Sequence, residues 1–221
     1  MYYLTRIDSL PVRYWYPPKP VYAISSAPCG GGLGWRNWVV NATVPADYNR
    51  KDPEVHLEGI ARRLGLYGFG IGMLTAVDVG QRAVFSEDDG VAGSATVGLG
   101  NPTWAAAPDG DLRSLKVGTI NIMIQLPVMM TDAALVNAVA TATEAKVQAL
   151  LDCGVEATGT ATDGLAILCA PSVIGGNPQT FEKFGGPRST WGARIARAVH
   201  SAVKTGSKIW MAEQSLERLT K

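Results

Sequence analysis

The loop that reads TGTATD, residues 158–163, holds the side chains best suited to chemistry. It places the hydroxyls of Thr160 and Thr162 beside the carboxylate of Asp163. A hydroxyl next to a carboxylate is a candidate nucleophile with its base, and a carboxylate alone can activate a water molecule. The residues do not decide between these two readings.

A second polar group lies in the stretch GTINI, where Thr119 supplies a hydroxyl and Asn121 an amide. Asn121 is flanked by Ile120 and Ile122, as in a buried strand. Strands disfavour Asn, and a buried amide without partners costs about 1–3 kcal/mol. Asn121 therefore either finds partners inside the protein or faces a site, where it can serve as an oxyanion donor.

The helix expected after this strand carries a polar stripe. Asn137, Thr141, Glu144 and Gln148 fall at helical spacing and share one face. Only Glu144 is charged, whereas a solvated face normally carries more Lys and Glu. The stripe is either plain surface or the wall of a wet cleft. Lys146, within a turn of Glu144, can act as a base if burial lowers its pKa, or can clamp a carboxylate product.

Several common chemistries are excluded. The two histidines, His56 and His200, lie in expected amphipathic helices, so a Ser–His–Asp triad is not expected. No HExxH, HxH or CxxC spacing is present, so we expect no metal ion and no other cofactor. Cys29, Cys153 and Cys169 are widely spaced and read as reduced thiols of a cytoplasmic protein.

The glycine-rich stretch CGGGLG matches no nucleotide-phosphate loop. It is either a tight turn or a backbone cradle in which Gly31 and Gly32 approach a ligand closely. Ser25 and Ser26 precede it and Asn41 follows it, so more hydroxyl and amide groups lie nearby.

The elements that must position these residues follow from periodicity and capping signals. Strands are expected at 21–27, 36–44, 68–79, 91–100, 117–126 and 164–170, with a flexible turn at 28–34. Helices are expected after Asp52, with Pro53 in first position, and at 132–152, 189–204 and 207–219. This order predicts an α+β fold, a mixed β-sheet core with flanking helices in a single layered domain.

Composition limits the class of protein. The 221 residues are 47% hydrophobic and 18% charged, with a net charge of +1 and no basic block. We therefore expect a globular protein with no nucleic-acid partner. Apolar runs are too short for a membrane span. Residues 1–19 form an aromatic, Pro-rich arm or edge strand, and 20–221 form the main domain. The arm and the last two helices are candidates for a homo-oligomer contact.

The motifs together resemble the adenosylcobinamide amidohydrolase family of corrinoid-salvage enzymes. The resemblance covers about residues 20–205, and its pieces occur in the family's order. They are SSAPCGGGLGWRNWVVNATVP (25–45), GMLTAVDV (72–79), ATVGLGNP (95–102), GTINIMI (118–124), LVNAVATATEAKVQALLDCGV (135–155) and ATGTATD (157–163).

The resemblance implies hydrolysis of the amide that joins the aminopropanol arm of adenosylcobinamide to the corrin ring, giving adenosylcobyric acid. The cobalt would belong to the substrate. We expect a metal-free mechanism in which catalysis falls to Asp163, Thr160, Glu144, Lys146 and Asn121. The expected substrate-binding residues are Ser25, Ser26, Gly31, Gly32, Asn41, Thr119, Asn137, Thr141 and Thr162. Two alternatives are a non-catalytic corrinoid-binding protein and a different small-molecule amidase on the same fold.

Overall fold

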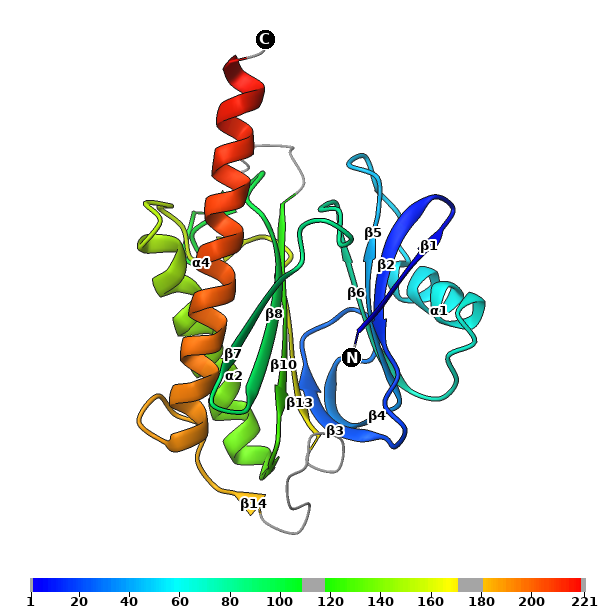
Figure 1. Cartoon of the computed structure of the whole chain (residues 1–221), viewed down its shortest axis with the longest axis vertical. Coiled ribbons are helices and arrows are strands. Elements are labelled where there is room, and N and C mark those ends of the chain that lie inside the picture. The colour runs from blue at the N-terminus through cyan, green and yellow to red at the C-terminus, as the bar shows by residue number, and fades with distance from the viewer. Residues whose placement is uncertain (1, 109–117, 171–180, 220–221) are drawn as a thin grey trace.

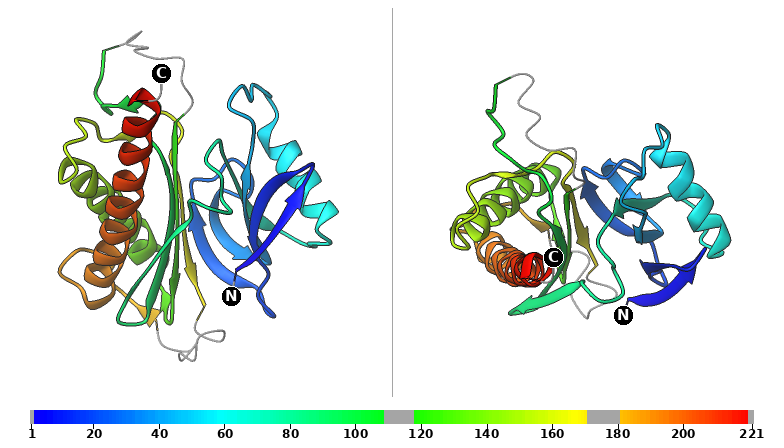
Figure 2. Two further views of the ribbon diagram at one scale, coloured as in Figure 1. Left: turned by 45° about the horizontal axis from the view of Figure 1, so that its top comes forward. Right: turned by 90° about the horizontal axis from the view of Figure 1, so that it is seen from above.

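A computed structural model describes residues 2–108, 118–170 and 181–219. The chain forms four layers, which Figures 1 and 2 show from several sides. Helix α1 (Pro53–Arg63) covers a four-stranded sheet, which packs face to face on a six-stranded sheet. Helices α2 (Asp132–Leu151) and α4 (Thr190–Leu219) cover the outer face of the six-stranded sheet. The expected α+β class, with mixed sheets and flanking helices, is confirmed.

The four-stranded sheet has the order β1-β2-β5-β6. Its strands are β1 (Tyr3–Ile7), β2 (Leu10–Trp15), β5 (Trp38–Thr43) and β6 (Gly70–Thr75). β1 and β2 form an antiparallel hairpin, so the expected N-terminal arm lies within this sheet, with β1 at its edge. β5 and β6 are parallel and are connected through α1, since parallel neighbours need a crossover.

The six-stranded sheet has the order β4-β3-β13-β10-β8-β7. Its strands are β3 (Val21–Ser25), β4 (Gly32–Arg36), β7 (Val84–Asp88), β8 (Val91–Gly98), β10 (Thr119–Leu126) and β13 (Gly164–Cys169). Only β10 and β13 pair in parallel in this sheet, and α2 connects them. Two short pairs lie outside it: β9 (Pro102–Thr103) with β12 (Gly159–Thr160), and β11 (Met129–Met130) with β14 (Phe181–Glu182).

β10 is buried on both faces because it lies between the helices and the other sheet. Ile120, Ile122 and Ile124 belong to the core under α2 and α4. Met123 belongs to the core between the two sheets. Because side chains alternate along a strand, Asn121 also points to the space between the sheets. The polar residue in this apolar strand therefore faces the second sheet.

The ends of the helices confirm one of the boundaries expected from the sequence and contradict another. Thr131 caps α2, with its Oγ1 accepting from the backbone N–H of Ala134 at 3.3 Å. The expected separation of 189–204 from 207–219 is wrong, because α4 is continuous through both. A side chain at Gly206 would lie 2.6 Å from Val97, and Ser207 is fully buried. Gly206 thus permits close packing of α4 on β8 and does not end a helix.

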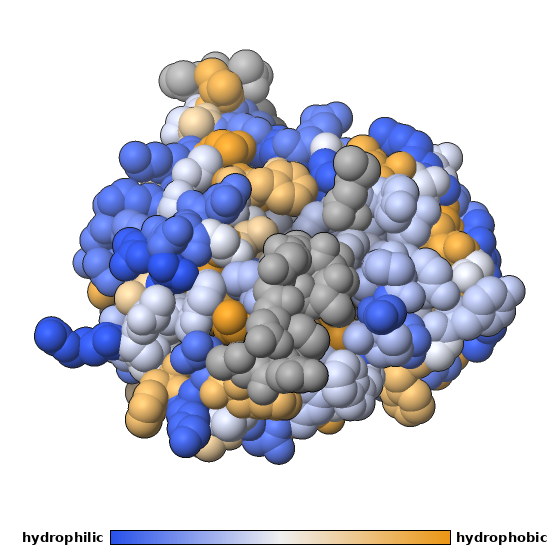
Figure 3. Space-filling model, turned by 60° about the horizontal axis from the view of Figure 1, so that its bottom comes forward, coloured by the Kyte–Doolittle hydropathy of each residue, from blue (hydrophilic) through white to orange (hydrophobic). Residues whose placement is uncertain are grey.

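The expected turn at 28–34 is wrong in its second half, since β4 begins at Gly32. No helix in the described part of the chain is long and apolar enough to cross a membrane. On the face in Figure 3, the described apolar residues lie in separate patches among hydrophilic ones.

Candidate active site

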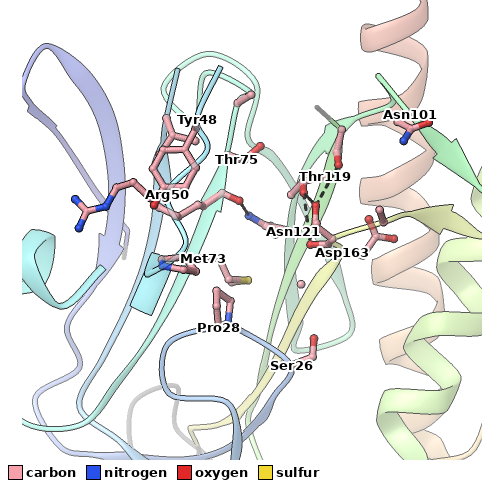
Figure 4. Close-up of a pocket in the computed structure, with 18 residues that line it drawn as sticks. Ser26, Pro28, Tyr48, Arg50, Met73, Thr75, Asn101, Thr119, Asn121 and Asp163 are labelled. Carbon is pink, nitrogen blue, oxygen red and sulfur yellow. Dashed lines mark hydrogen bonds between the residues drawn. The ribbon is translucent and has the colours of Figure 1, made fainter. Parts of the chain in front are cut away.

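A cavity of about 580 Å³ opens between the two sheets at one end of their strands (Figure 4). Its volume falls within the roughly 300–1,000 Å³ typical of small-molecule sites. The four-stranded sheet contributes the end of β6, and the six-stranded sheet contributes the starts of β10 and β13. The lining residues include Ser26, Pro28, Tyr48, Arg50, Met73, Thr75, Asn101, Thr119, Asn121, Thr162 and Asp163.

Among the described residues that line this cavity, Asp163 is the one that carries a carboxylate. Its Oδ1 accepts from the backbone N–H of Ile120 at 3.0 Å and from the hydroxyl of Thr160. Its Oδ2 accepts from the backbone N–H of Thr160 at 3.2 Å and pairs with the ammonium of Lys146. These four donors match the roughly four lone-pair positions of a carboxylate, so the Asp163 side chain is held in one orientation.

Lys146 reaches this carboxylate from α2, and the pair is largely shielded, with side-chain exposures of 12% and 15%. A side chain at Gly159 would come closer than 3.0 Å to both charged groups. Because glycine has no side chain, it leaves enough space at this position for the ion pair to form. The structure thus brings together Asp163, Thr160 and Lys146, three of the residues expected to be catalytic.

Thr119 and Thr162 form a hydroxyl pair on the cavity wall. Thr162 donates to the carbonyl of Gly118 at 3.2 Å, so its own oxygen remains available to accept from Thr119. Neither hydroxyl bonds to the Asp163 carboxylate among the described contacts. The hydroxyl that does bond to it, that of Thr160, belongs to a residue that does not line the cavity.

The amide of Asn121 finds partners inside the protein and also lines the cavity. Its Nδ2 donates to Asn41 Oδ1 and to the carbonyl of Leu74, each at 2.9 Å. Both N–H groups are thus committed in this structure, so none is left for an oxyanion. Asn41 lies beneath Asn121 and donates to Thr96 Oγ1 at 3.1 Å.

The two serines at the end of β3 have different surroundings. Ser26 is exposed in the cavity, and its Oγ accepts from the backbone N–H of Leu165 at 3.0 Å. Ser25 is buried and donates to the Leu165 carbonyl at 2.9 Å. Of the two, only Ser26 presents a hydroxyl to the cavity.

The backbone of the glycine stretch surrounds the side chain of Arg36. The buried guanidinium of Arg36 donates to the carbonyls of Gly30, Gly31 and Gly32 at 2.9, 3.1 and 3.4 Å. Gly30 has a φ of +68°, and a side chain there would collide with the Gly70 carbonyl. The structure therefore places Gly31 and Gly32 around Arg36, outside the cavity lining.

The polar stripe on α2 lies apart from the cavity. Asn137 and Glu144 are exposed, and none of the stripe lines the cavity. Thr141 is buried, and its hydroxyl donates to the Gly185 carbonyl at 2.9 Å.

Sequence reasoning missed the outer wall of the cavity, which comes from the segment between β5 and α1. Tyr48 and Arg50 lie there, and the Tyr48 hydroxyl meets His56 Nδ1 at 3.0 Å with the two rings stacked. Burial lowers the pKa of His56. Arg50 is paired with Asp52 at 2.8 Å. The sequence offered one signal for Tyr48 and Arg50, their place in a loop that follows a buried strand, since such loops often carry binding sites.

Within the described residues, no three side chains of His, Cys, Asp or Glu lie close enough together to hold a metal ion. The three cysteines are unpaired, and burial raises the pKa of Cys169 to about 11 and that of Cys29 above its usual value. Because the thiolate is the reactive form, these two thiols are poorly suited to nucleophilic attack.

Comparison with known proteins shows which family the sequence matches. The sequence model of the family described as adenosylcobinamide amidohydrolase matches residues 4–215. A protein from Methanosarcina mazei named adenosylcobinamide amidohydrolase is 31% identical over 182 residues. That match covers 81% of this chain and 86% of the relative.

Proposed function

The chain belongs to the adenosylcobinamide amidohydrolase family, and we propose that it cleaves the aminopropanol amide of adenosylcobinamide. In this reaction a water hydroxyl bonds to the carbonyl carbon while the carbon–nitrogen bond breaks. The nitrogen takes the remaining proton of the water and then the proton of the new carboxylic acid, so aminopropanol leaves in its ammonium form and the corrinoid keeps a carboxylate. The product, adenosylcobyric acid, would return to coenzyme B12 synthesis.

The observation that carries the proposal is a cavity lined by several hydroxyl and amide groups and by the Asp163 carboxylate, which pairs with the Lys146 ammonium behind it. A corrinoid bears many amides, and the cavity offers hydroxyl, amide and backbone groups that suit them. A whole corrinoid exceeds a cavity of about 580 Å³. The aminopropanol arm therefore enters the cavity, and the ring lies at its mouth near Tyr48 and Arg50.

We assign the proton transfers to Asp163 and Lys146. Asp163 lines the cavity and accepts the proton of the attacking water, giving up one of its four hydrogen bonds. Of its donors, Lys146 is on the most flexible stem, so this bond is the easiest to release. Lys146 then supplies the proton that the departing amine needs. Transfer of the proton from Asp163 to Lys146 then restores the carboxylate and the ammonium for the next turnover.

Thr119, Thr162 and Ser26 present hydroxyls to the cavity, and we assign to them the binding of the attacking water and of the substrate carbonyl. Thr160 fixes the carboxylate through two hydrogen bonds and acts as a positioning residue. The cobalt stays with the substrate. We also propose a cytoplasmic location, which the three unpaired cysteines support.

The test is the release of aminopropanol from adenosylcobinamide, measured for the wild type and for Asp163→Asn and Lys146→Met. Removal of a general acid or base costs about 10²–10⁴-fold in turnover. Glu156→Gln, an exposed carboxylate outside the cavity, is the matched control and should keep wild-type turnover. Near-normal turnover in both pair variants would refute the assignment of Asp163 and Lys146.

The same measurement separates the alternatives. Binding of adenosylcobinamide, followed by its visible spectrum, without release of aminopropanol would indicate a corrinoid-binding protein. Release from other small amides but not from cobinamide would indicate a different amidase.

A further inference from the structure

The cavity floor contains a chain of amide hydrogen bonds that joins the two sheets. It runs from the Leu74 carbonyl through Asn121 and Asn41 to the hydroxyl of Thr96. Asn121 and Asn41 are each 2% exposed, and Thr96 is also 2% exposed. Buried amides are costly unless their groups are paired, so this chain fixes both Asn side chains in one arrangement.

The direction of the chain is determined by its first member. The Leu74 carbonyl can only accept, so the Asn121 atom facing it, at 2.9 Å, must be Nδ2. The second N–H of Asn121 goes to Asn41 Oδ1, also at 2.9 Å. The remaining atom, Asn121 Oδ1, can therefore only accept.

Asn121 Oδ1 is left without a donor among the described residues. It lies over Gly164, where an added side chain would come within 2.8 Å of it, and beside Met73. Gly164 and Met73 both line the cavity. The oxygen thus lies beside two residues of the cavity lining, on a side chain that lines the cavity itself and is almost wholly buried.

We infer that Asn121 Oδ1 is the specificity acceptor for the N–H of the scissile secondary amide. The inference rests on the proposed function and extends it. A buried oxygen that can only accept gains a hydrogen bond from a substrate that carries an N–H. With a substrate that lacks the N–H, the same oxygen stays unpaired. Sites built to bond a polar group reject analogues that lack it far more strongly than apolar pockets do. The site would therefore prefer the amide over the ester in which oxygen replaces the N–H.

Asn41 takes the role of a positioning residue in this arrangement. It does not line the cavity, but its Oδ1 holds one of the two N–H groups that orient Asn121. Without that bond, Asn121 is held only by the Leu74 carbonyl and can turn its oxygen away from the substrate.

The experiment compares two probes, adenosylcobinamide and its ester isostere, on the full chain. We measure kcat/KM for the wild type, Asn121→Ala and Asn41→Ala, with product release as the readout. Asn121→Ala should lose about 10–100-fold on the amide and less than about 3-fold on the ester. Asn41→Ala should show the same selective loss to a smaller degree.

The amide-to-ester ratio separates recognition from damage to the fold, because misfolding lowers both rates equally. Thr143→Val removes an exposed hydroxyl on α2 that bonds only within its own helix, and should leave both rates unchanged. If Asn121→Ala does not fold, the ratio for Asn41→Ala decides. Equal losses on both probes would overturn the inference alone. A wild-type chain that cleaves neither probe would overturn the proposed function as well.

Discussion

Substituting Gly159 by Ala tests whether the space around the ion pair matters. The new methyl carbon would come closer than 3.0 Å to Asp163 Oδ2 and to Lys146 Nζ, where ordinary contact begins at about 3.4 Å. Asp163 is held by three further hydrogen bonds, from Ile120 and Thr160. The nearer of the two atoms is Asp163 Oδ2, so these bonds must yield, and Lys146, at the end of a flexible stem, is displaced as well.

The size of the effect follows from the burial of the pair. Overpacking a tight site costs about 1–3 kcal/mol, and each kcal/mol lowers Tm by about 2–4 °C for a chain of this length. Separating the pair should also lower turnover, by the roughly 10²–10⁴-fold that a lost acid or base costs. Asp163 and Lys146 would both still be present, so the loss would come from their displacement.

The assays are thermal unfolding and aminopropanol release. Gly59→Ala is the matched control, because Gly59 lies in α1 and the nearest atom to an added side chain is 4.0 Å away. It should raise stability by up to about 1 kcal/mol and leave turnover unchanged. A Gly159→Ala protein with wild-type Tm and wild-type turnover would show that the pair tolerates the intrusion and that the reasoning is wrong.

Two further predictions concern residues outside the ion pair. Thr141→Val should lower the free energy of unfolding by about 1–3 kcal/mol, since the Gly185 carbonyl loses its donor, and should leave KM unchanged; a raised KM at full stability would instead support substrate binding by Thr141. Burial lowers the pKa of His56 below 6.5, so the unfolded chain binds the proton more readily and stability should fall as pH drops below about 6.5. His56→Asn should flatten this dependence in thermal unfolding between about pH 5 and pH 7.5, and an unchanged slope would assign the dependence to other groups.

The fold class was predictable because the strands and helices carry strong local patterns. β10 reads as a long apolar strand, and Thr131 marks the start of α2. The division into two sheets was not predictable, since the pairing of β5 with β6 and of β10 with β13 joins segments far apart in the sequence. The continuity of α4 was hidden for a similar reason, because Gly206 is explained only by its contact with Val97.

The candidate site was predictable in part. TGTATD and Lys146 are local signals, and the structure brings Asp163, Thr160 and Lys146 into contact. The polar stripe on α2 did not mark the cavity, because none of its four residues lines it. Tyr48 and Arg50 have no motif of their own, and only the packing of two sheets places them opposite Asp163.

The two polar centres of the cavity depend on one strand pairing. In the parallel register of β10 and β13, Asn121 lies opposite Gly164, the residue that follows Asp163. This register brings the Ile120 N–H to the Asp163 carboxylate and leaves Asn121 Oδ1 above a residue without a side chain. A slip of one residue would turn Asn121 toward α2 and bury an isoleucine side chain in the cavity. The apolar residues of β10 therefore do more than fill a core, because their burial under the helices fixes the register that aims both the carboxylate and the amide at one space.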